Sequence, residues 1–420
     1  MNSHICIFED SQFDRLFPLV YFRPVCNLKC GITTLREKII RAYPKASVSL
    51  HCRTYLVDTV RARYPQIRVN DIPADSCLFI NGRVLPGRDF SAKIPLKEDK
   101  DTLYMAGDVV VAARVSGARL ARLKTQLGNP LTPSNFDDMP RMQVDVKTVT
   151  YSWDLVQNNG AQLVADFEAL VGRKKMKSRK LPGVYLLEKN RIFIDPSATI
   201  KPGVVLDAEK GPIYIDKNAS VLPQTSIVGP VYVGQGSIVR AGSTIYENTS
   251  IGPVCKVGGE VEDTIIQGYS NKQHSGFVGH AYLGSWVNLG AGTNNSDLKN
   301  NYGHVKVQLG SEQIDTGLQF VGLTMGDHSK SAINSQFNTG TVVGVSSNIF
   351  GSGFPPKYVP SFSWGAAGET FTTYQVDRAI NVARRVMARR KIELTAPEEA
   401  LFRKIFEMTS IHRKKQGMPA

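Results

Sequence analysis

The residues best suited to chemistry lie in one polar stretch, from Asn271 to Asp297. This stretch contains His274 and Asn288, and the whole chain has only 7 histidines. A neutral imidazole can act as a general base on an amine or hydroxyl nucleophile near neutral pH. The alternative is that His274 and the nearby asparagines only satisfy backbone groups in turns, as asparagine often does. Spacing alone leaves both interpretations open.

The stretch belongs to a segment in which aliphatic residues recur every six positions. The regular part reads Ile215, Val221, Ile227, Val233, Val239, Ile245, Ile251 and Val257. Neither an α-helix nor a simple alternating strand has this period. The period is typical of a chain coiled into short parallel strands, with one inward side chain per flat face and a turn after each strand. An ordinary β-sandwich would need strands of irregular length, so we predict a parallel β-solenoid.

Interruptions of the six-residue pattern indicate where binding groups can be held. The pattern begins at Ile194 and Ile200, shifts phase near 210–212, loosens over 258–273, returns with Phe277, Leu283 and Leu289, breaks over 294–313, and resumes with Met325, Ser331, Phe337, Val343 and Ile349. Inserted segments leave the flat faces of a solenoid as loops. We therefore expect the function to lie between Gly258 and Gly303, and the regular part to be scaffold apart from Arg240.

Residues 191–354 resemble the left-handed β-helix of hexapeptide-repeat acyltransferases. The match is strongest with the acetyltransferase half of the bifunctional enzymes that make UDP-N-acetylglucosamine, on His274, Gly279, Ala281, Gly284 and the run Val287-Asn-Leu-Gly-Ala-Gly-Thr293. The resemblance implies that His274 deprotonates a sugar amine, which then attacks the thioester of acetyl-CoA. It also implies that Asn288 holds the sugar and that Ala291 lies along the path of the pantetheine arm.

Two further motifs extend the same resemblance. Arg240, in Val239-Arg-Ala-Gly242, matches a phosphate-contacting arginine of the family, and Asn301-Tyr302-Gly303 resembles one of its substrate loops. Arg240 and Tyr302 are therefore implied to be substrate contacts. The family places its sites between neighbouring solenoids, which implies a homotrimer.

Residues 1–185 alternate apolar strands with amphipathic helices, which predicts an α/β domain with a mostly parallel sheet. The expected strands are 5–8, 47–50, 76–80 and 108–115, and the expected helices are 34–43, 55–64, 117–127 and 153–171. After the solenoid, residues 366–420 are expected to form a helical extension. Its helices, at 372–390 and 397–408, are expected to cover the open end of the solenoid, which otherwise exposes unpaired strand edges.

The N-terminal domain carries a second resemblance, to sugar-1-phosphate nucleotidyltransferases. The run from Arg15 to Pro24 resembles their signature, which implies Arg15 and Arg23 as anion contacts and UTP with Mg²⁺ as reactants. Such enzymes hold the triphosphate with a glycine-rich loop. Here that place reads Phe8-Glu-Asp-Ser-Gln-Phe13, with two acids and no glycine. Asn81 stands where a metal-binding aspartate is expected, and a neutral amide is a poorer Mg²⁺ ligand than a carboxylate.

The positive net charge of the chain raises the question of a nucleic-acid partner. The formal charge of +14 is concentrated in basic runs at 173–180, 384–391 and 412–415. These runs contain no interleaved aromatic residues, and no nucleic-acid motif is present, so we expect no nucleic-acid partner. We interpret the basic runs as solvated faces of a linker and of helices. Their positive field also attracts phosphorylated sugars and nucleotides, which are anions.

The same composition gives an expectation for the compartment. No apolar run is long enough to span a bilayer, and the N-terminus lacks the features of a signal peptide, so we predict a cytoplasmic protein without membrane contact. The 6 cysteines are scattered, which fits a reducing compartment. Cys26 and Cys30 form an isolated pair that we interpret as buried thiols and not as metal ligands.

Three functions follow from these observations. The leading one is an enzyme of sugar-nucleotide synthesis for the cell envelope, which transfers acetyl to an amino-sugar phosphate in the β-helix and has nucleotidyl transfer as a second candidate activity. The second is a nucleotidyltransferase whose solenoid serves assembly. The third is a non-catalytic regulatory or scaffold protein, and the missing glycine-rich loop is the main argument for it.

Overall fold

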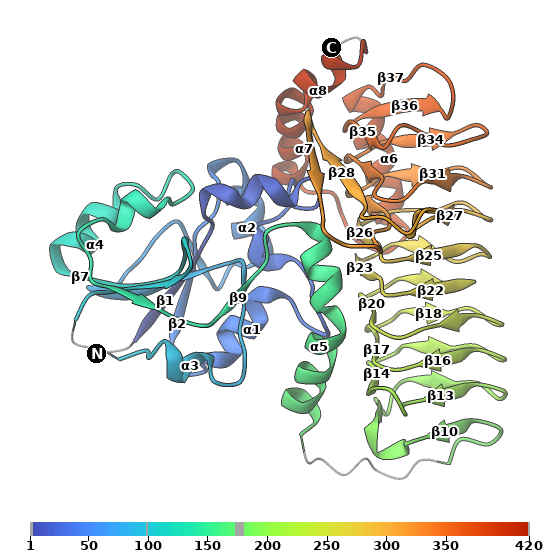
Figure 1. Ribbon diagram of the computed structural model, residues 1–420, viewed down its shortest axis with the longest axis horizontal. Coiled ribbons are helices and arrows are strands. Elements are labelled where there is room, and N and C mark those ends of the chain that lie inside the picture. Colours follow the sequence, from blue (N-terminus) through green and yellow to red (C-terminus); the bar gives the residue numbers. More distant parts are fainter. Residues whose placement is uncertain (1–2, 98–99, 173–179, 419–420) are drawn as a thin grey trace.

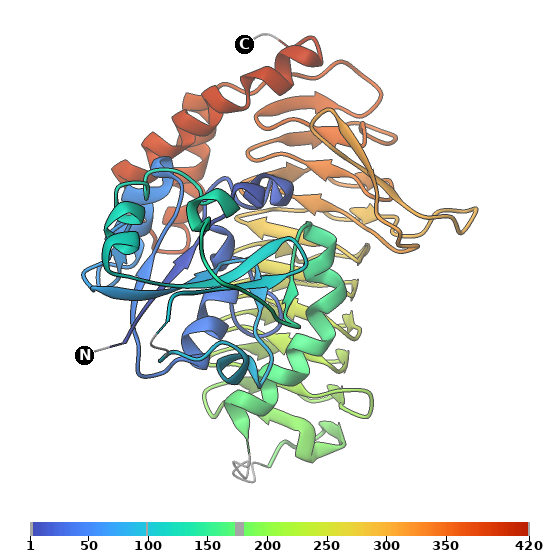
Figure 2. The same cartoon turned by 60° about the vertical axis from the view of Figure 1, so that its left-hand side comes forward.

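The computed structural model describes residues 3–97, 100–172 and 180–418. An α/β domain lies beside a long β-helix, and helices of the C-terminal segment lie against both (Figures 1 and 2). The expected basic linker at 173–180 falls outside the described residues except for Lys180. Among the described helices, none is both long and apolar enough to cross a membrane.

The N-terminal domain is built on a seven-stranded sheet in the order β3-β2-β1-β4-β7-β6-β8. Its strands are β1 (His4–Phe8), β2 (Ser47–Leu50), β3 (Arg68–Val69), β4 (Ser76–Asn81), β6 (Thr102–Ala106), β7 (Val109–Ser116) and β8 (Arg141–Gln143), and β5 (Val84–Leu85) pairs separately with β9 (Lys147–Thr148). All neighbours in the large sheet are parallel except where β7 pairs with β4 and β6. The predicted mostly parallel sheet is therefore confirmed. Both faces of β1 are buried, which explains its unbroken apolar sequence.

Helices cover this sheet and connect it to the β-helix. They are α1 (Leu35–Ala42), α2 (Val57–Arg63), α3 (Phe90–Lys93), α4 (Gly117–Lys124) and α5 (Ser152–Val171), with short 3-10 helices at 11–16, 25–27, 54–56, 133–136 and 189–191. α1 begins at Thr34, whose side chain and that of Glu37 form a reciprocal capping box. α5 runs along one face of the β-helix, so the two domains share a long interface (Figure 1).

The β-helix has short strands stacked into parallel sheets, one for each flat face. The first face holds β10 (Tyr185–Leu187), β13 (Val205–Asp207), β16 (Ser226–Val228), β19 (Thr244–Ile245), β22 (Glu260–Glu262) and β25 (Phe277–Gly279), with β27 (Asn294–Asn295) and β32 (Gln336–Phe337) as a separate pair. The second face, which α5 contacts, holds β11 (Ile192–Ile194), β14 (Ile213–Ile215), β17 (Val231–Val233), β20 (Thr249–Ile251), β23 (Ile265–Gly268), β26 (Tyr282–Ser285), β30 (Thr324–Met325), β33 (Val342–Val343) and β35 (Tyr358–Val359).

The third face holds β12 (Thr199–Ile200), β15 (Ser220–Val221), β18 (Ile238–Val239), β21 (Lys256–Val257), β24 (Asn271–Lys272), β31 (Lys330–Ser331), β34 (Asn348–Phe350), β36 (Ser363–Ala366) and β37 (Thr372–Thr373). The register from Ile215 to Val233 to Ile251 contains three six-residue repeats per coil, and all three side chains are fully buried. The expected left-handed parallel β-helix is confirmed.

The interior changes character where the sequence pattern loosens. Val278, and not the expected Phe277, points into the core, because Val261 pairs with Val278 in the register of the first face. Lys272 pairs with Val257 and thus takes an interior position. Asn295 is also buried, and its amide bonds both the N–H and the C=O of Gly279. The residues between 296 and 323 then leave the coil and include the hairpin of β28 (Lys306–Leu309) and β29 (Glu312–Asp315).

The C-terminal segment forms α6 (Val376–Ala388), α7 (Ala396–Met408) and α8 (Ser410–Lys415). The helix expected at 372–390 begins later, because residues 372–373 form β37 and pair with β36. The expectation that these helices cover the open end needs correction, since α7 packs against α2 and lies beside the last coils (Figure 1). Phe371 and Met418 instead enter the apolar interior of the β-helix and close it.

Candidate functional site

The predicted base and the predicted cofactor contact lie at one corner of the β-helix. His274 follows β24, and Ala291 occupies the equivalent turn of the next coil, where Gly292 N donates to Ser275 O at 3.2 Å. His274 is exposed, and its ring has no hydrogen bond within the described part of the chain. The turn approaches the next coil closely, because a Cβ on Gly276 would lie 2.2 Å from Thr293 O. An accessible imidazole therefore stands directly below a turn of small residues.

Asn288 lies on the flat face that leads into this corner. It bridges Asn271 in the coil below and Lys330 in the coil above, and its Oδ1 accepts a hydrogen bond from Asn271 Nδ2 at 3.2 Å. Asn271 in turn accepts a hydrogen bond from Arg390 Nη2 at 2.9 Å. The end of α6 therefore reaches the face that carries the predicted sugar contact, and Asn288 and His274 lie on neighbouring coils.

Positive charge surrounds this face, and within the described ranges its cations Arg240, Lys256 and Arg390 form no ion pair. Arg240 is exposed and lies lower on the same corner, since a Cβ on Gly258 would approach Arg240 Cβ at 3.1 Å. Lys256 pairs directly with Asn271 in the sheet. Burial lowers the pKa of Lys256, and the charges of Arg390, Arg389 and Arg240 lower it further. Such an uncompensated group of cations favours a phosphorylated ligand.

Lys272, which the sequence interpretation missed as a functional candidate, supports the turn that carries His274. Its side chain is buried and its Nζ donates to His274 O at 2.8 Å. Burial lowers the pKa of Lys272 to about 8, although the charge of Glu260 acts in the opposite direction. The sequence pattern did not reveal this position, because it placed Phe277 inward, and the interior place of Lys272 follows from its pairing with Val257.

A second unpredicted cluster holds the inserted segment on the coil. His280 Nδ1 is 2.8 Å from Asp297 Oδ2, and its Nε2 is 3.8 Å from Asp263 Oδ2. Its ring stacks on Phe320 with centroids 5.0 Å apart. Burial alone lowers the pKa of His280, but the hydrogen bond to Asp297 and the neighbouring carboxylates outweigh it and leave the pKa raised. The His280 side chain therefore contacts both ends of the insertion, at Asp297 and at Phe320.

Tyr302 lies within that insertion and is 66% exposed. Its backbone N–H donates to Lys299 O at 2.9 Å, and its carbonyl accepts from Gln319 Nε2 at 2.9 Å. Its ring has no partner among the residues that the structure describes. The side chain is therefore free to meet a ligand or a neighbouring chain, but no contact joins it to His274.

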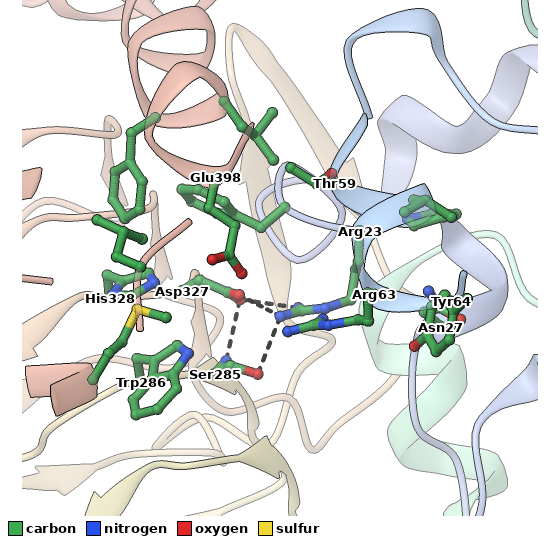
Figure 3. A pocket seen from close by; sticks show the side chains of 17 residues that line it. Arg23, Asn27, Thr59, Arg63, Tyr64, Ser285, Trp286, Asp327, His328 and Glu398 are labelled. Carbon is green, nitrogen blue, oxygen red and sulfur yellow. Dashed lines mark hydrogen bonds and ion pairs between the residues drawn. The ribbon is translucent and has the colours of Figure 1, made fainter. Parts of the chain in front are cut away.

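The two N-terminal arginines occupy different environments and do not meet. Arg15 is exposed and stacks over the ring of Tyr151 at 5.7 Å. Arg23 is buried, and its guanidinium donates to Asp327 Oδ1 at 2.9 Å, forms an ion pair with the other carboxylate oxygen, and donates to Ser285 Oγ at 3.1 Å (Figure 3). Arg23 therefore joins the N-terminal domain to the β-helix and has little capacity left for a substrate anion.

Two buried ion pairs fill the place of the glycine-rich loop, just beyond β1. Glu9 binds the guanidinium of Arg53, and Asp10 binds that of Arg83. Asn81 Nδ2 also donates to Asp10 Oδ2 at 2.9 Å, and the nearby hollow measures only about 30 Å³. Because Asp10 is already engaged, it does not fit Mg²⁺ binding. Among the described residues, no three His, Cys, Asp or Glu side chains come together in a way that could hold a metal ion.

The structure joins an α/β domain to a parallel β-helix, and known proteins resemble parts of this arrangement. Residues 5–175 match the family model described as "Sugar nucleotidyl transferase". The chain is 30% identical over 186 residues to the bifunctional protein GlmU of Nostoc sp., covering 39% of this chain and 40% of that protein. It is 26% identical over 239 residues to GlmU of Synechococcus elongatus, covering 52% and 49%.

A third relative is the bifunctional sugar-1-phosphate nucleotidylyltransferase/acetyltransferase of Sulfurisphaera tokodaii. It is 31% identical over 167 residues, which cover 38% of this chain and 40% of that protein. The chain thus spans about half or less of the length of the curated relatives it matches. Its similarity to these bifunctional proteins is therefore partial.

Proposed function

We propose that this protein is a transferase of sugar-nucleotide synthesis that moves an acetyl group from acetyl-CoA to an amino-sugar phosphate. The proposal rests on one corner of the β-helix, where the accessible His274 lies below Ala291 and on the coil next to that of Asn288. The cations of Arg240 and Lys256 face the same side of the β-helix. The name of the Sulfurisphaera tokodaii relative, which combines sugar-1-phosphate nucleotidyl transfer with acetyl transfer, supports the same assignment.

In the proposed reaction His274 accepts a proton as the sugar amine forms a bond to the thioester carbonyl carbon. The carbon–sulfur bond then breaks, and coenzyme A leaves as the thiol after it regains the proton. Asn288 orients the sugar, Arg240 and Tyr302 hold its phosphate side, and the small side chain of Ala291 leaves room for the pantetheine arm. The turn of His274 is kept in place by Lys272, whose ammonium bonds the His274 carbonyl.

We further propose that the protein works as a homotrimer in the cytoplasm. Ile333 lies one coil above Ala291 at the same corner and is 69% exposed, and the neighbouring Asn334 N donates to Ala291 O at 2.6 Å. An exposed aliphatic residue beside a polar site is a suitable contact for a second solenoid. Light scattering on the purified chain tests this assembly, and a monomer that retains full activity would contradict it.

Release of free thiol from acetyl-CoA in the presence of glucosamine-1-phosphate tests the transfer. We expect His274→Ala to lower the rate about 10²–10⁴-fold, the usual contribution of a general base. His412→Gln, at the far C-terminal end, is the matched control and should leave the rate unchanged. Thiol release that survives His274→Ala would refute the assignment of the base.

Nucleotidyl transfer in the N-terminal domain is a second candidate function, supported by the family match of residues 5–175. Arg15 would be its exposed anion contact, whereas the ion pairs at Glu9 and Asp10 occupy the place of the triphosphate loop. Pyrophosphate formation from UTP and N-acetylglucosamine-1-phosphate, with Mg²⁺ added, is the test. Absence of pyrophosphate with every nucleotide and sugar phosphate tried would assign this domain a non-catalytic role.

A further inference from the structure

A groove of about 470 Å³ separates the N-terminal domain from the β-helix, away from the corner of His274. One wall comes from the loop after Arg23 and the end of α2, and includes Asn27, Arg63 and Tyr64. The other wall is formed by successive coils and includes Tyr269 and Trp286, whose rings stack at 4.5 Å. A smaller hollow next to it shares several of these residues (Figure 3). Neither domain makes this groove alone.

Asn27 presents an unsatisfied acceptor in the groove. The residue is only 5% exposed, yet its side-chain Oδ1 has no hydrogen-bond partner among the residues described by the structure. The loop around it is fixed, because Gln267 Nε2 donates to Asn27 O at 2.8 Å and Lys29 N donates to Gln267 Oε1 at 3.0 Å. Buried amide oxygens are almost always paired in folded proteins, so this one needs a donor from a ligand or from water. A sugar hydroxyl is such a donor.

The same wall carries the exposed guanidinium of Arg63, which forms no ion pair in the described ranges of the chain. Glu398 lines the adjoining hollow with Arg63, but its carboxylate accepts from Thr395 N and Oγ1 at 3.0 Å in the cap of α7. Arg36 lies behind this wall, 3.9 Å from the ring of Tyr64, and does not line the groove. Arg23, by contrast, is neutralised by Asp327. This part of the groove therefore favours an anion, and guanidinium groups suit the oxygens of a phosphate.

The acids that also line the groove are already engaged. Glu37 accepts hydrogen bonds from Thr34 N and Oγ1 at 2.8 Å in the cap of α1. Asp216 accepts a hydrogen bond from Tyr232 OH at 2.8 Å. Lys29 reaches the same end, with its Nζ bonded to Ile32 O and placed over the ring of Tyr232. Positive and negative charges are thus balanced at the end of the groove with Lys29 and Asp216, whereas the end at Arg63 is cationic. This difference in charge gives an elongated ligand one orientation.

We propose that this groove binds a phosphorylated sugar, either free or as part of a nucleotide sugar. The phosphate lies at Arg63, a hydroxyl donates to Asn27 Oδ1, and the apolar side of the ring packs against Tyr64 and Trp286. Aromatic walls with a few converging polar groups are usual for small-ligand sites at domain boundaries. Because both domains supply contacts, bound ligand favours the arrangement in which they are joined.

Calorimetric titration of the full chain tests this proposal, with N-acetylglucosamine-1-phosphate, UDP-N-acetylglucosamine, N-acetylglucosamine and inorganic phosphate as separate probes. We expect the phosphorylated sugars to bind at least about tenfold more tightly than the other two probes, since only they engage both Asn27 and Arg63. If the free sugar phosphate and the nucleotide sugar bind equally, the sugar-phosphate part alone is recognised. Tighter binding of the nucleotide sugar identifies that form as the ligand.

Variants separate the groove from the transfer corner. Arg63→Gln and the isosteric Asn27→Asp should each weaken binding about tenfold or more, the latter through repulsion of the phosphate. Arg61→Gln is the matched control, because this exposed arginine lies on the same helix but does not line the groove. His274→Ala must retain the binding whether or not acetyl transfer occurs. The proposal is overturned if no phosphorylated sugar binds, if Arg61→Gln weakens binding as much as Arg63→Gln, or if His274→Ala alone abolishes it.

Discussion

The ion pair between Arg23 and Asp327 should be a strong link between the two domains. Both side chains are almost fully buried, with 4% and 3% of their surfaces exposed. Arg23 Nη1 also donates to Leu19 O at 2.9 Å, and Asp327 Oδ1 also accepts from Ser285 N at 3.1 Å. Leu19 O, Ser285 Oγ and the Asp327 carboxylate all lose the guanidinium as a donor if Arg23 is replaced, and only Ser285 N still donates to Asp327. We therefore expect Arg23→Met to be far more harmful than an ordinary surface substitution.

The size of the effect follows from the charge that remains. With Arg23 absent, the Asp327 carboxylate stays buried with one backbone N–H as its donor, and breaking a buried pair in this way costs about 3–5 kcal/mol. Replacing both partners, as in Arg23→Met with Asp327→Leu, removes the buried charge and should cost much less. We therefore expect a coupling free energy of at least about 2 kcal/mol in the double-mutant cycle.

Urea unfolding followed by tryptophan fluorescence measures this cycle, because Trp286 lies beside the pair in the same hollow. The matched control is Arg68→Met, which breaks an exposed pair with Asp71 whose side chains are 60% and 54% accessible. Exposed pairs contribute only about 0–1 kcal/mol. The reasoning fails if Arg23→Met costs no more than Arg68→Met, or if the double variant is as unstable as the two single losses added together.

Three other outcomes follow from the site. Because the pKa of His280 is raised in the folded state, its contribution to stability is complete below its unfolded pKa and is lost as pH rises through the folded value. The protection factors of residues 296–323 in hydrogen exchange, taken relative to the intrinsic rate at each pH, should therefore fall from pH 6 to pH 8, and Asp297→Asn should remove this fall. Lys272→Met should raise thermal stability at pH 7, where the buried ammonium of Lys272 is still charged. The same change should lower the transfer rate, because His274 loses the anchor of its turn. Equal stability of the unmodified chain at pH 7 and pH 10 would contradict the expected cost of burying that charge. Gly276→Ala, with φ of +107° and no room for a Cβ, should cost several kcal/mol, on the order of an overpacked core, and an unchanged melting temperature would show that the turn can relax.

The fold was largely predictable because its signals are local and repeated. One inward side chain per six residues is fixed by the geometry of a three-faced coil, and Ile215, Val233 and Ile251 meet that rule without help from distant contacts. Prediction was wrong at Phe277, where one strand is displaced by one residue and Val278 turns inward. A displacement of this kind depends on pairing with the previous coil, which the sequence of a single strand does not show.

The site was predictable only in part. The six-residue pattern and the family resemblance together pointed to His274, Asn288 and Ala291, but their roles stay predictions that the transfer assay has to test. Lys272 supports the turn of His274 only when its side chain is buried inside the folded coil, and the sequence does not show that contact. The assignment of Arg23 as an anion contact was based on a local motif, whereas its partner Asp327 lies 304 residues away. Contacts of that range cannot be read from spacing.

In the N-terminal domain, the loop just beyond β1 contributes to packing, whereas the groove is suited to ligand binding. Glu9 and Asp10 stand where a triphosphate loop is expected, and each is held by a buried arginine, so that loop contributes mainly to the packing of its own domain. Among the described residues of the N-terminal domain, unpaired polar groups are found instead at Asn27 and Arg63, on the wall that faces the β-helix, and at Arg36 Nε behind it. Unsatisfied groups mark where a folded chain can still gain free energy from a ligand, because satisfied ones must first exchange partners. By this criterion the interdomain groove, more than the end of β1, is where the N-terminal domain is prepared to bind.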